Sequence, residues 1–546
     1  MRTTQTRSLI CNPALPTNCV SRRRLFIIAI LFASLLLRVP SNRPAAMSSE
    51  TSPLLPQQQT TNEPPDIPST EGPKTRTRSQ WPWLYVVAIL LLLAFVADMA
   101  ETLLVAPRIR FIEAIACYRY YKIHDPSVIG LHSHVPEELC KIDEIQSKVM
   151  SIMGGQLFFD SIPSILLPIP YSMLADSWGR KPVLTLGLVG CVLYMLVFMF
   201  LAGLSGLPLE QSWLSALCLI IGGGPSVATT WLTTMVADVV PPQLRSTVFF
   251  YRFCCDQVSD LLMPPVTAAL MAHGVWPPLF VVVALQVITV LVSLVLPETL
   301  PIPEDKGVSD PSEEDVSSNH DAQGSNSKGV SLLASLTESF ASFMRDRTVM
   351  LLVFTFLISR LGRQTNAVVL LQYASKKYGW SLSKAGLLVS IRAAVNIVLF
   401  VIILPVIVNF LLPGRSAATK DLLVGKISIL LLTLGAFIMF NENSVPWLII
   451  GLVVSTLGAG FPPVMRSLTT SLVELQNDGH ASDIGRLYAL IGIMEGIGNL
   501  VAGPGLAWAF NLGMSWGKAW LGLPYALATA LFACICVIVF SVRINT

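Results

Sequence analysis

Twelve apolar runs separated by polar segments constrain this chain more than any other feature of its sequence. Most of the runs reach about 20 residues, the length at which a helix crosses the hydrocarbon core of a bilayer. Because that core offers no water, the backbone has to satisfy its own hydrogen bonds, which favours helices. We therefore expect an all-α membrane protein whose twelve transmembrane helices cover residues 82–106, 149–175, 183–204, 213–239, 248–272, 277–296, 349–369, 382–404, 427–440, 445–468, 487–510 and 519–542.

The composition supports a membrane protein and excludes several functions. Hydrophobic residues make up 53% of the chain and charged residues only 13%, which is too apolar for a soluble protein. A net charge of +3 is too small to indicate a nucleic-acid partner. The sequence contains neither a Gly-x-x-x-x-Gly-Lys-[Ser/Thr] loop for ATP nor a Cys/His spacing of the zinc type. We therefore expect no cofactor, no metal site and no enzymatic activity.

The runs form two groups of six, predicted as six-helix bundles over residues 81–296 and 348–546. Residues 297–347 form the polar linker between them. An even number of spans places both termini and this linker on one side. Short loops rich in Lys and Arg identify that side as the cytoplasm. Residues 47–80 are Pro-rich and too poor in apolar residues to fold, so we expect a disordered cytoplasmic tail.

The first 46 residues contain a signal-like segment, because three arginines precede a thirteen-residue apolar run at residues 25–37. We favour translation from Met47, which would make residues 1–46 an upstream extension. A functional signal segment is the alternative. The tail that follows contains Glu50, Leu54 and Leu55 in the pattern of an acidic dileucine sorting signal. That pattern is short, so vacuolar sorting through an adaptor and chance remain equally open.

A polar loop between the second and third runs, residues 172–184, carries Asp176, Gly179, Arg180 and Lys181. It resembles the signature loop of the major facilitator superfamily, Gly-x-Leu-Ala-Asp-Arg-x-Gly-Arg-Lys-x-x-Leu. Ser172 and Ser177 replace the first Gly and the first Arg of that pattern. The resemblance extends from residue 81 to the C-terminus and implies two six-helix bundles that move about a central site. It also implies that this loop latches the cytoplasmic side, with Asp176 paired to Arg180 or placed at a helix N-terminus.

The first external loop, predicted at residues 107–148, contains two cysteines, Cys117 and Cys140. Two cysteines in one exoplasmic loop are a candidate disulfide, and two free thiols are the alternative. The stretch from Cys140 to Gln146 also resembles, more weakly, fungal transporters that are similar to the proton-coupled folate carriers.

Charged residues inside spans mark candidate functional positions, since each costs at least about 2.5 kcal/mol near the bilayer centre. In one interpretation the charges pair between helices and hold the bundle together, with Arg252 satisfied by Asp256 in its own helix. In the other, carboxylates carry protons and arginines bind a carboxyl-bearing substrate. The carboxylate candidates are Asp260, Asp256, Glu495, Asp98, Glu101 and Asp160. We place Asp260 first, because it lies farther from Arg252 than Asp256 does. The arginine candidates are Arg360, Arg363 and Arg392.

Together these features predict a proton-coupled secondary transporter of a small organic solute, an anionic or amphipathic metabolite such as a secondary metabolite. Efflux is favoured, as in many fungal proteins that this chain resembles. Proton-coupled uptake, or a sensor that binds without transport, are the alternatives. We expect a multi-pass protein of the plasma membrane, with the vacuolar membrane as the alternative.

Overall fold

The computed structural model describes residues 83–130, 135–241, 244–299, 347–407, 417–442, 444–476 and 481–542. All of these belong to one unit of the chain, Pro73–Thr546. The predictions for residues 1–80, namely the start at Met47, the tail and the sorting signal, lie outside the described residues. Residues 300–346 of the predicted linker lie outside them as well.

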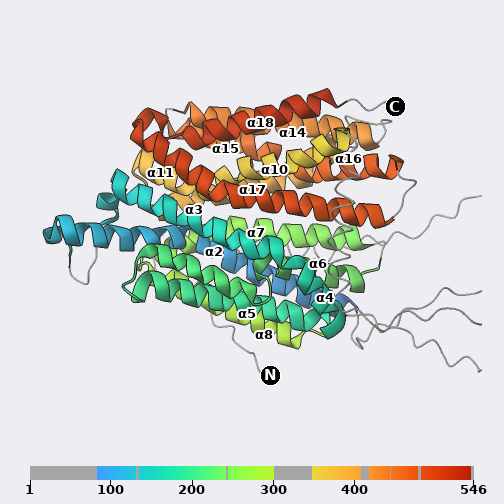
Figure 1. Ribbon diagram of the computed structural model, residues 1–546, viewed down its shortest axis with the longest axis horizontal. Coiled ribbons are helices and arrows are strands. Elements are labelled where there is room, and N and C mark those ends of the chain that lie inside the picture. The colour runs from blue at the N-terminus through green and yellow to red at the C-terminus, as the bar shows by residue number, and fades with distance from the viewer. Residues whose placement is uncertain are drawn as a thin grey trace, which may run out of the picture. The chain divides into compact units, whose positions relative to one another are not determined.

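The described residues fold into helices that we group into two halves (Figure 1). The N-terminal half contains α2 (Trp83–His124), α3 (Asp143–Leu166), α4 (Pro168–Trp178), α5 (Arg180–Met199), α6 (Gly224–Val239), α7 (Arg245–Met271) and α8 (Trp276–Val295). The C-terminal half contains α10 (Arg347–Val368), α11 (Leu370–Tyr378), α12 (Leu382–Val398), α13 (Leu404–Val406), α14 (Ala417–Phe440), α15 (Val445–Leu457), α16 (Phe461–Gln476), α17 (Ala481–Ser515) and α18 (Leu523–Ser541).

Among the described residues, 10 helical segments are long and apolar enough to cross a membrane. Two further predicted spans, α7 and α10, are helical but lie outside that set. Their sequences explain why, since α7 carries Arg252, Asp256 and Asp260, while α10 carries Arg360 and Arg363. The predicted all-α membrane fold is therefore confirmed, and the two spans outside the set each carry two candidate site residues, as α2 does with Asp98 and Glu101.

The first helix is much longer than predicted. The first span was expected to end at residue 106, but α2 continues through Pro107 to His124 and has 42 residues. Proline removes one backbone hydrogen bond and usually kinks a helix, yet here the helix resumes beyond it. The predicted loop at residues 107–148 is wrong at both ends, because α3 already begins at Asp143.

Several predicted spans are interrupted helices. The fourth consists of η5 (Leu209–Ile220), a 3-10 segment, followed by α6. Between them Gly222 has a φ of 82°, a left-handed conformation that favours glycine. The eighth continues from α12 through η7 (Leu399–Ile403), and the tenth is divided by η9 (Gly458–Gly460). The third ends in η4 (Phe200–Leu204).

The two halves contact each other through α3 with α17 and α7 with α12. Figure 1 shows α3 and α17 running side by side. Glycines permit the close approach of this pair, since a Cβ at Gly154 would lie only 2.6 Å from the backbone oxygen of Gly503. One apolar core cluster includes residues of both halves, among them Phe111 and Ile145 with Tyr373 and Leu382.

Candidate functional site

A cavity of about 380 Å³ lies between the two halves. Helices α2, α3, α5, α6, α7 and α8 line it from the N-terminal half, and α10 and α17 from the C-terminal half. Much of the wall is apolar and formed by leucines, including Leu93, Leu104, Leu157, Leu184, Leu188 and Leu232. The volume falls in the range of small-molecule sites, about 300–1,000 Å³. This cavity can hold a small amphipathic molecule.

Four of the candidate residues line the cavity, namely Asp98, Glu101, Asp160 and Arg360. Asp98 forms a two-pronged ion pair with Arg252, whose two terminal nitrogens lie 2.6 and 2.9 Å from its carboxylate oxygens. The expectation that Arg252 pairs with Asp256 in its own helix is therefore wrong. The guanidinium reaches instead across to α2, where both carboxylate oxygens of Asp98 face its fork.

Asp160 also has an ion-pair partner and hydrogen-bond donors within the protein. Arg108 lies 3.4 Å from its carboxylate, Tyr194 donates a hydrogen bond at 2.9 Å, and Gln156 donates one at 2.8 Å. Arg108 was not among the predicted site residues, because the sequence placed it in an external loop. The 42-residue helix α2 instead carries Arg108 into the cavity wall.

Asp260 joins the two halves. Arg392 on α12 donates to its carboxylate at 2.9 Å, and Thr102 on α2 donates to the other oxygen at 2.8 Å. Nearby, the Ser390 hydroxyl donates to the backbone oxygen of Leu261 at 2.9 Å. The reason for placing Asp260 first among unpaired carboxylates is therefore wrong, since its partner comes from the opposite half rather than from Arg252.

Glu101 and Arg360 face the same cavity from opposite halves, and neither forms an ion pair with a described residue. Within the described part of the chain, Glu101 forms no hydrogen bond or ion pair. Arg360 forms no ion pair there, and its Nε donates to the Asn499 side chain at 2.8 Å. Sequence reasoning missed Asn499 because an uncharged amide in a span carries no distinctive signal.

The remaining candidates lie outside the cavity lining. Glu495 pairs with Arg466 at 2.6 Å inside the C-terminal half. The Nε of Arg363 is buried without a hydrogen-bond partner among the described residues. Asp256 accepts a hydrogen bond from Gln257 at 2.7 Å and forms no ion pair with any described residue.

The loop between α4 and α5 is held differently from the prediction. Arg180 forms an ion pair with Asp238 at the end of α6, whereas Asp176 is exposed. The Glu298 carboxylate accepts hydrogen bonds from the backbone N–H groups of Arg180 at 3.0 Å and Lys181 at 3.2 Å. Gly179 has a φ of 106°, and a Cβ there would overlap Glu298. The anion at the N-terminus of α5 is thus Glu298, not Asp176.

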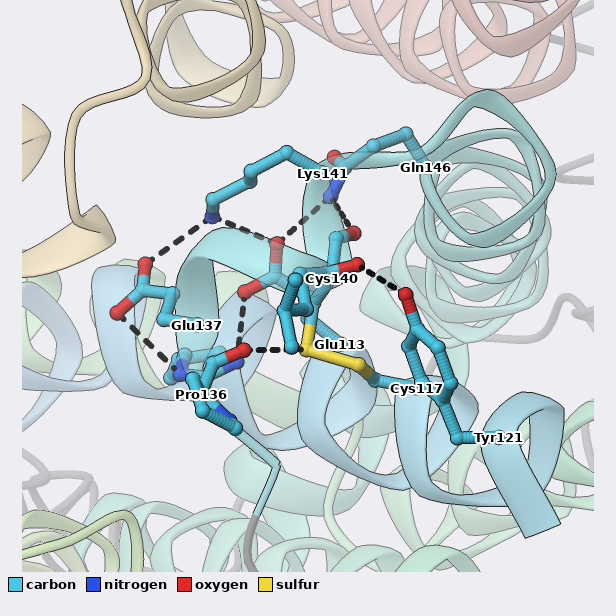
Figure 2. The surroundings of a disulfide bond; sticks show 10 residues. Glu113, Cys117, Tyr121, Pro136, Glu137, Cys140, Lys141 and Gln146 are labelled. Atoms are coloured by element: carbon cyan, nitrogen blue, oxygen red, sulfur yellow. Dashed lines mark hydrogen bonds and ion pairs between the residues drawn. A yellow bond between two sulfur atoms is a disulfide. The ribbon is translucent and has the colours of Figure 1, made fainter. Parts of the chain in front are cut away.

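Near the first residue of α3, at the end of the molecule opposite the α4–α5 loop, Cys117 of α2 and Cys140 of η3 (Glu137–Lys141) form a disulfide (Figure 2). We call this the disulfide end, and the end that carries the α4–α5 loop the Gly179 end. Beside the disulfide, Glu113 is 1% exposed. It accepts hydrogen bonds from Arg110 at 2.9 Å, Lys141 at 2.7 Å and Gln146 at 2.6 Å.

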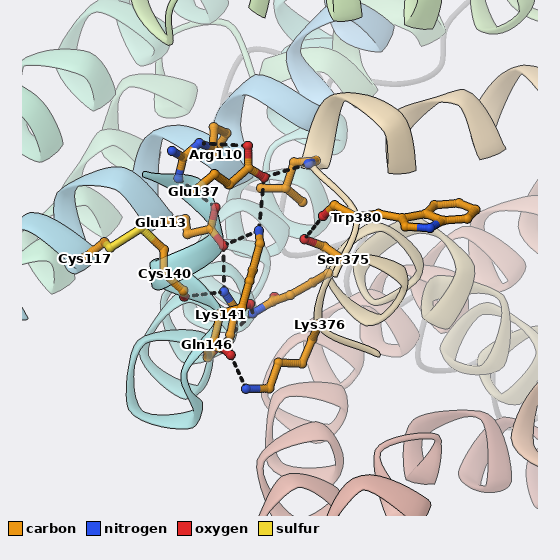
Figure 3. A network of polar contacts seen from close by, with 12 residues as sticks. Arg110, Glu113, Cys117, Glu137, Cys140, Lys141, Gln146, Ser375, Lys376 and Trp380 are labelled. Atoms are coloured by element: carbon orange, nitrogen blue, oxygen red, sulfur yellow. Dashed lines mark hydrogen bonds and ion pairs between the residues drawn. A yellow bond between two sulfur atoms is a disulfide. The ribbon is translucent and has the colours of Figure 1, made fainter. Parts of the chain in front are cut away.

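This network continues into the C-terminal half (Figure 3). The Glu137 carboxylate accepts a hydrogen bond from the backbone N–H of Leu382 at 2.8 Å. Gln372 donates to the side chain of Gln146 at 3.0 Å, and Lys376 pairs with Asp143 at 2.6 Å. These polar contacts, like those of Asp260, hold the two halves together on the side of the cavity nearer the disulfide end.

In the described ranges, no group of three or more His, Cys, Asp and Glu side chains is arranged to hold a metal ion. The polar chemistry of the cavity consists of carboxylates, guanidinium groups and amides.

Comparison with solved structures supports the fold. The nucleoside transporter NupG covers 84% of this chain and 100% of its own length, with a TM-score of 0.56 at 13% identity. A D-xylose-proton symporter covers 84% and 98%, with a TM-score of 0.56 at 11% identity. At these identities the likeness concerns the fold alone.

Sequence comparison is more specific. Residues 149–503 match the family model of the Major Facilitator Superfamily. The "MFS efflux pump atnC" of Emericella nidulans is 35% identical over 484 residues, which cover 88% of this chain and 92% of that protein. The "Efflux pump ustT" of Aspergillus flavus is 30% identical over 448 residues, covering 80% and 83%. The predicted resemblance to fungal members of this superfamily is confirmed. The chain belongs to the Major Facilitator Superfamily and is a multi-pass membrane transporter.

Proposed function

We propose that this transporter exports a small organic solute in exchange for protons, by alternating access of the central cavity to the two sides of the membrane. The observation that carries the proposal is Glu101, a carboxylate that faces the cavity without a cation partner among the described residues. The efflux direction is supported by the names of the relatives from Emericella nidulans and Aspergillus flavus.

The Gly179 end is assigned to the cytoplasm. Arg180 and Lys181 lie in a short loop there, and positive charge in short loops is retained on the cytoplasmic side. The disulfide end is then exoplasmic, where oxidising conditions allow disulfides to persist. On this assignment the contacts of Asp260, Glu137 and Gln146 with the C-terminal half support our proposal of a state that is closed on the exoplasmic side.

Glu101 is the proton carrier that this geometry favours. A low-dielectric environment favours the neutral form of a carboxylate that lacks a cation partner. When the cavity opens to water the charged form is solvated again, so Glu101 can bind and release a proton during each cycle. Asp256 is the next candidate, because it also lacks an ion pair among the described residues. Asp98, Asp160, Asp260 and Glu495 each have an arginine partner.

Inside-out membrane vesicles provide the test. Vesicles with an acidified lumen are incubated with a defined mixture of small amphipathic compounds, and mass spectrometry measures which of them accumulate. Accumulation that disappears when the proton gradient is collapsed supports the proposal. It should also be lost in Glu101→Gln and retained in Glu210→Gln, whose carboxylate is 37% exposed and pairs with Lys148 away from the cavity.

Accumulation that is indifferent to the gradient, or the same in Glu101→Gln as in the native chain, would contradict proton coupling through Glu101. Accumulation that occurs only when the proton gradient is reversed, with the lumen more alkaline than the medium, would indicate a proton-coupled uptake carrier instead. We also propose the plasma membrane as the location, and fluorescence microscopy of the tagged chain distinguishes it from the vacuolar membrane.

A further inference from the structure

We infer that the substrate carries both an ammonium and a carboxylate group on an apolar body, and that Glu101 and Arg360 hold its two charges. This inference rests on the proposed function, because it names the substrate class of the same cavity. It starts from the charged residues that line the cavity and from the partners that each of them has.

Six charged residues line the cavity, three acidic and three basic. Two opposite-charge pairs satisfy four of them, Asp98 with Arg252 and Asp160 with Arg108. The charges left without an ion pair among the described residues are Glu101 and Arg360. One lies on α2 in the N-terminal half and the other on α10 in the C-terminal half.

Arg360 is arranged to bind a carboxylate. Its Nε is fixed by the Asn499 side chain at 2.8 Å. The two terminal nitrogens make no hydrogen bond with another described residue, and they form the fork that binds a carboxylate through two parallel hydrogen bonds. Asn499 comes from α17, so it holds the guanidinium at the cavity wall from a neighbouring helix.

Glu101 is arranged to bind an ammonium group. It lies three residues from Asp98 on α2, and Arg252 already neutralises Asp98. The Glu101 side chain is exposed in a wall to which seven leucines also belong. An ammonium group supplies the cation and the N–H donors that no described residue places within hydrogen-bonding distance of Glu101.

Other substrate classes satisfy this pair less well. A purely anionic molecule would pair with Arg360 but leave Glu101 unpaired, and a purely cationic one would do the reverse. Enclosing an unpaired charge in a low-dielectric site is costly. A molecule with both groups satisfies both residues and connects the two halves, while its apolar body contacts the leucines.

A series of four ligands tests the inference by equilibrium binding to the detergent-purified chain, which requires no transport. The probe is the dipeptide Leu-Phe, compared with its N-acetyl form, its C-terminal amide, and the form blocked at both ends. We expect the free dipeptide to bind about tenfold to hundredfold more tightly than either singly blocked form. A dipeptide that binds no more tightly than its blocked forms, including one that does not bind, overturns the inference.

Two variants assign the two ends. Arg360→Gln should abolish the preference for a free carboxylate and keep the preference for a free amine, and Glu101→Gln should do the opposite. Equal loss of both preferences in each variant would contradict the assignment. Where a variant fails to fold, the ligand series on the native chain still tests the substrate class.

The test separates the inference from the proposed function. Selective binding of the free dipeptide without gradient-driven movement in vesicles would contradict proton-coupled export and support the substrate class. Gradient-driven export of singly charged compounds, together with equal binding of the four dipeptides, would contradict the substrate class and support proton-coupled export.

Discussion

The ion pair between Asp260 and Arg392 joins α7 of the N-terminal half to α12 of the C-terminal half at 2.9 Å. Replacing Arg392 with glutamine removes the cation and leaves Asp260 with Thr102 as its remaining hydrogen-bond donor among the described residues. The contacts on this side of the cavity hold the halves together at the disulfide end. We therefore predict that Arg392→Gln shifts the protein toward a state that is open at the disulfide end.

The size of the shift follows from burial. Truncating one partner of a buried, hydrogen-bonded charge pair costs about 2–5 kcal/mol. Here the two side chains are 29% and 14% exposed, and Thr102 keeps its hydrogen bond to Asp260 at 2.8 Å. Both features reduce the loss. We expect a change of about 1–2 kcal/mol, which alters the ratio of closed to open molecules by about 5- to 30-fold.

Distances between spin labels at the disulfide end measure this ratio. Cysteines at Ser127 and Lys384, one in each half, are labelled in a chain that lacks the free cysteines, and pulsed electron resonance gives the distance distribution. The matched control is Arg466→Gln, which breaks the Arg466–Glu495 pair inside the C-terminal half. A longer-distance population should grow in Arg392→Gln and not in the control. It should be smaller again in the double variant Asp260→Arg with Arg392→Asp, in which the two charges are exchanged. Identical distributions in Arg392→Gln and the control would refute the reasoning.

Three further predictions concern the two ends of the molecule. Gly179→Ala should lower the folded yield, because alanine is strained at a φ of 106° and its Cβ would overlap Glu298. Ser177→Ala, at an exposed position, should leave the yield unchanged, and size-exclusion chromatography compares the two variants. Cys117→Ser with Cys140→Ser should cost about 3 kcal/mol of stability by opening a loop of 23 residues, and a reductant should lower the melting temperature of the native chain but not of this variant. Glu113→Gln should destabilise the disulfide end, because an amide oxygen replaces a carboxylate that accepts hydrogen bonds from three donors. Proteolysis near residue 140 should become faster in this variant, whereas Glu138→Gln, at an exposed position, should leave the rate of proteolysis unchanged.

The spans could be predicted from sequence because hydropathy and length decide membrane insertion. The candidate charges could be found for the same reason, since Asp98, Glu101, Asp160 and Arg360 stand out against an apolar background. The ion-pair partners of these residues could not be predicted from the sequence. Arg252 pairs with Asp98, which lies 154 residues away along the chain, rather than with Asp256 in its own helix. Helical spacing describes neighbours on one helix and carries no information about which helices pack together.

The errors at the two ends have similar origins. The predicted end of the first span at residue 106 assumed that a span stops at the membrane surface, whereas α2 continues as an ordered helix to His124. This error moved Arg108 out of the predicted site. At the Gly179 end, Asp176 was the nearest carboxylate in sequence, but Asp238 and Glu298 reach Arg180 through the fold.

Alternating access of the cavity under proton control is the central claim, and a single cysteine at Ser226 tests it most directly. Ser226 lines the cavity on α6, and membrane-impermeant thiol reagents can be applied to either side of oriented vesicles. Among the described residues Glu101 has no ion pair. Closing the cavity over its charged form is therefore costly, so protonation should speed the exchange between the two sides. We predict labelling mainly from the Gly179 end, with labelling from the disulfide end rising as the buffer becomes acidic. Glu101→Gln should be labelled from both sides at every pH, after correction for the thiol itself. Labelling from the disulfide end that is independent of pH, or that depends on pH equally in Glu101→Gln, would contradict the account.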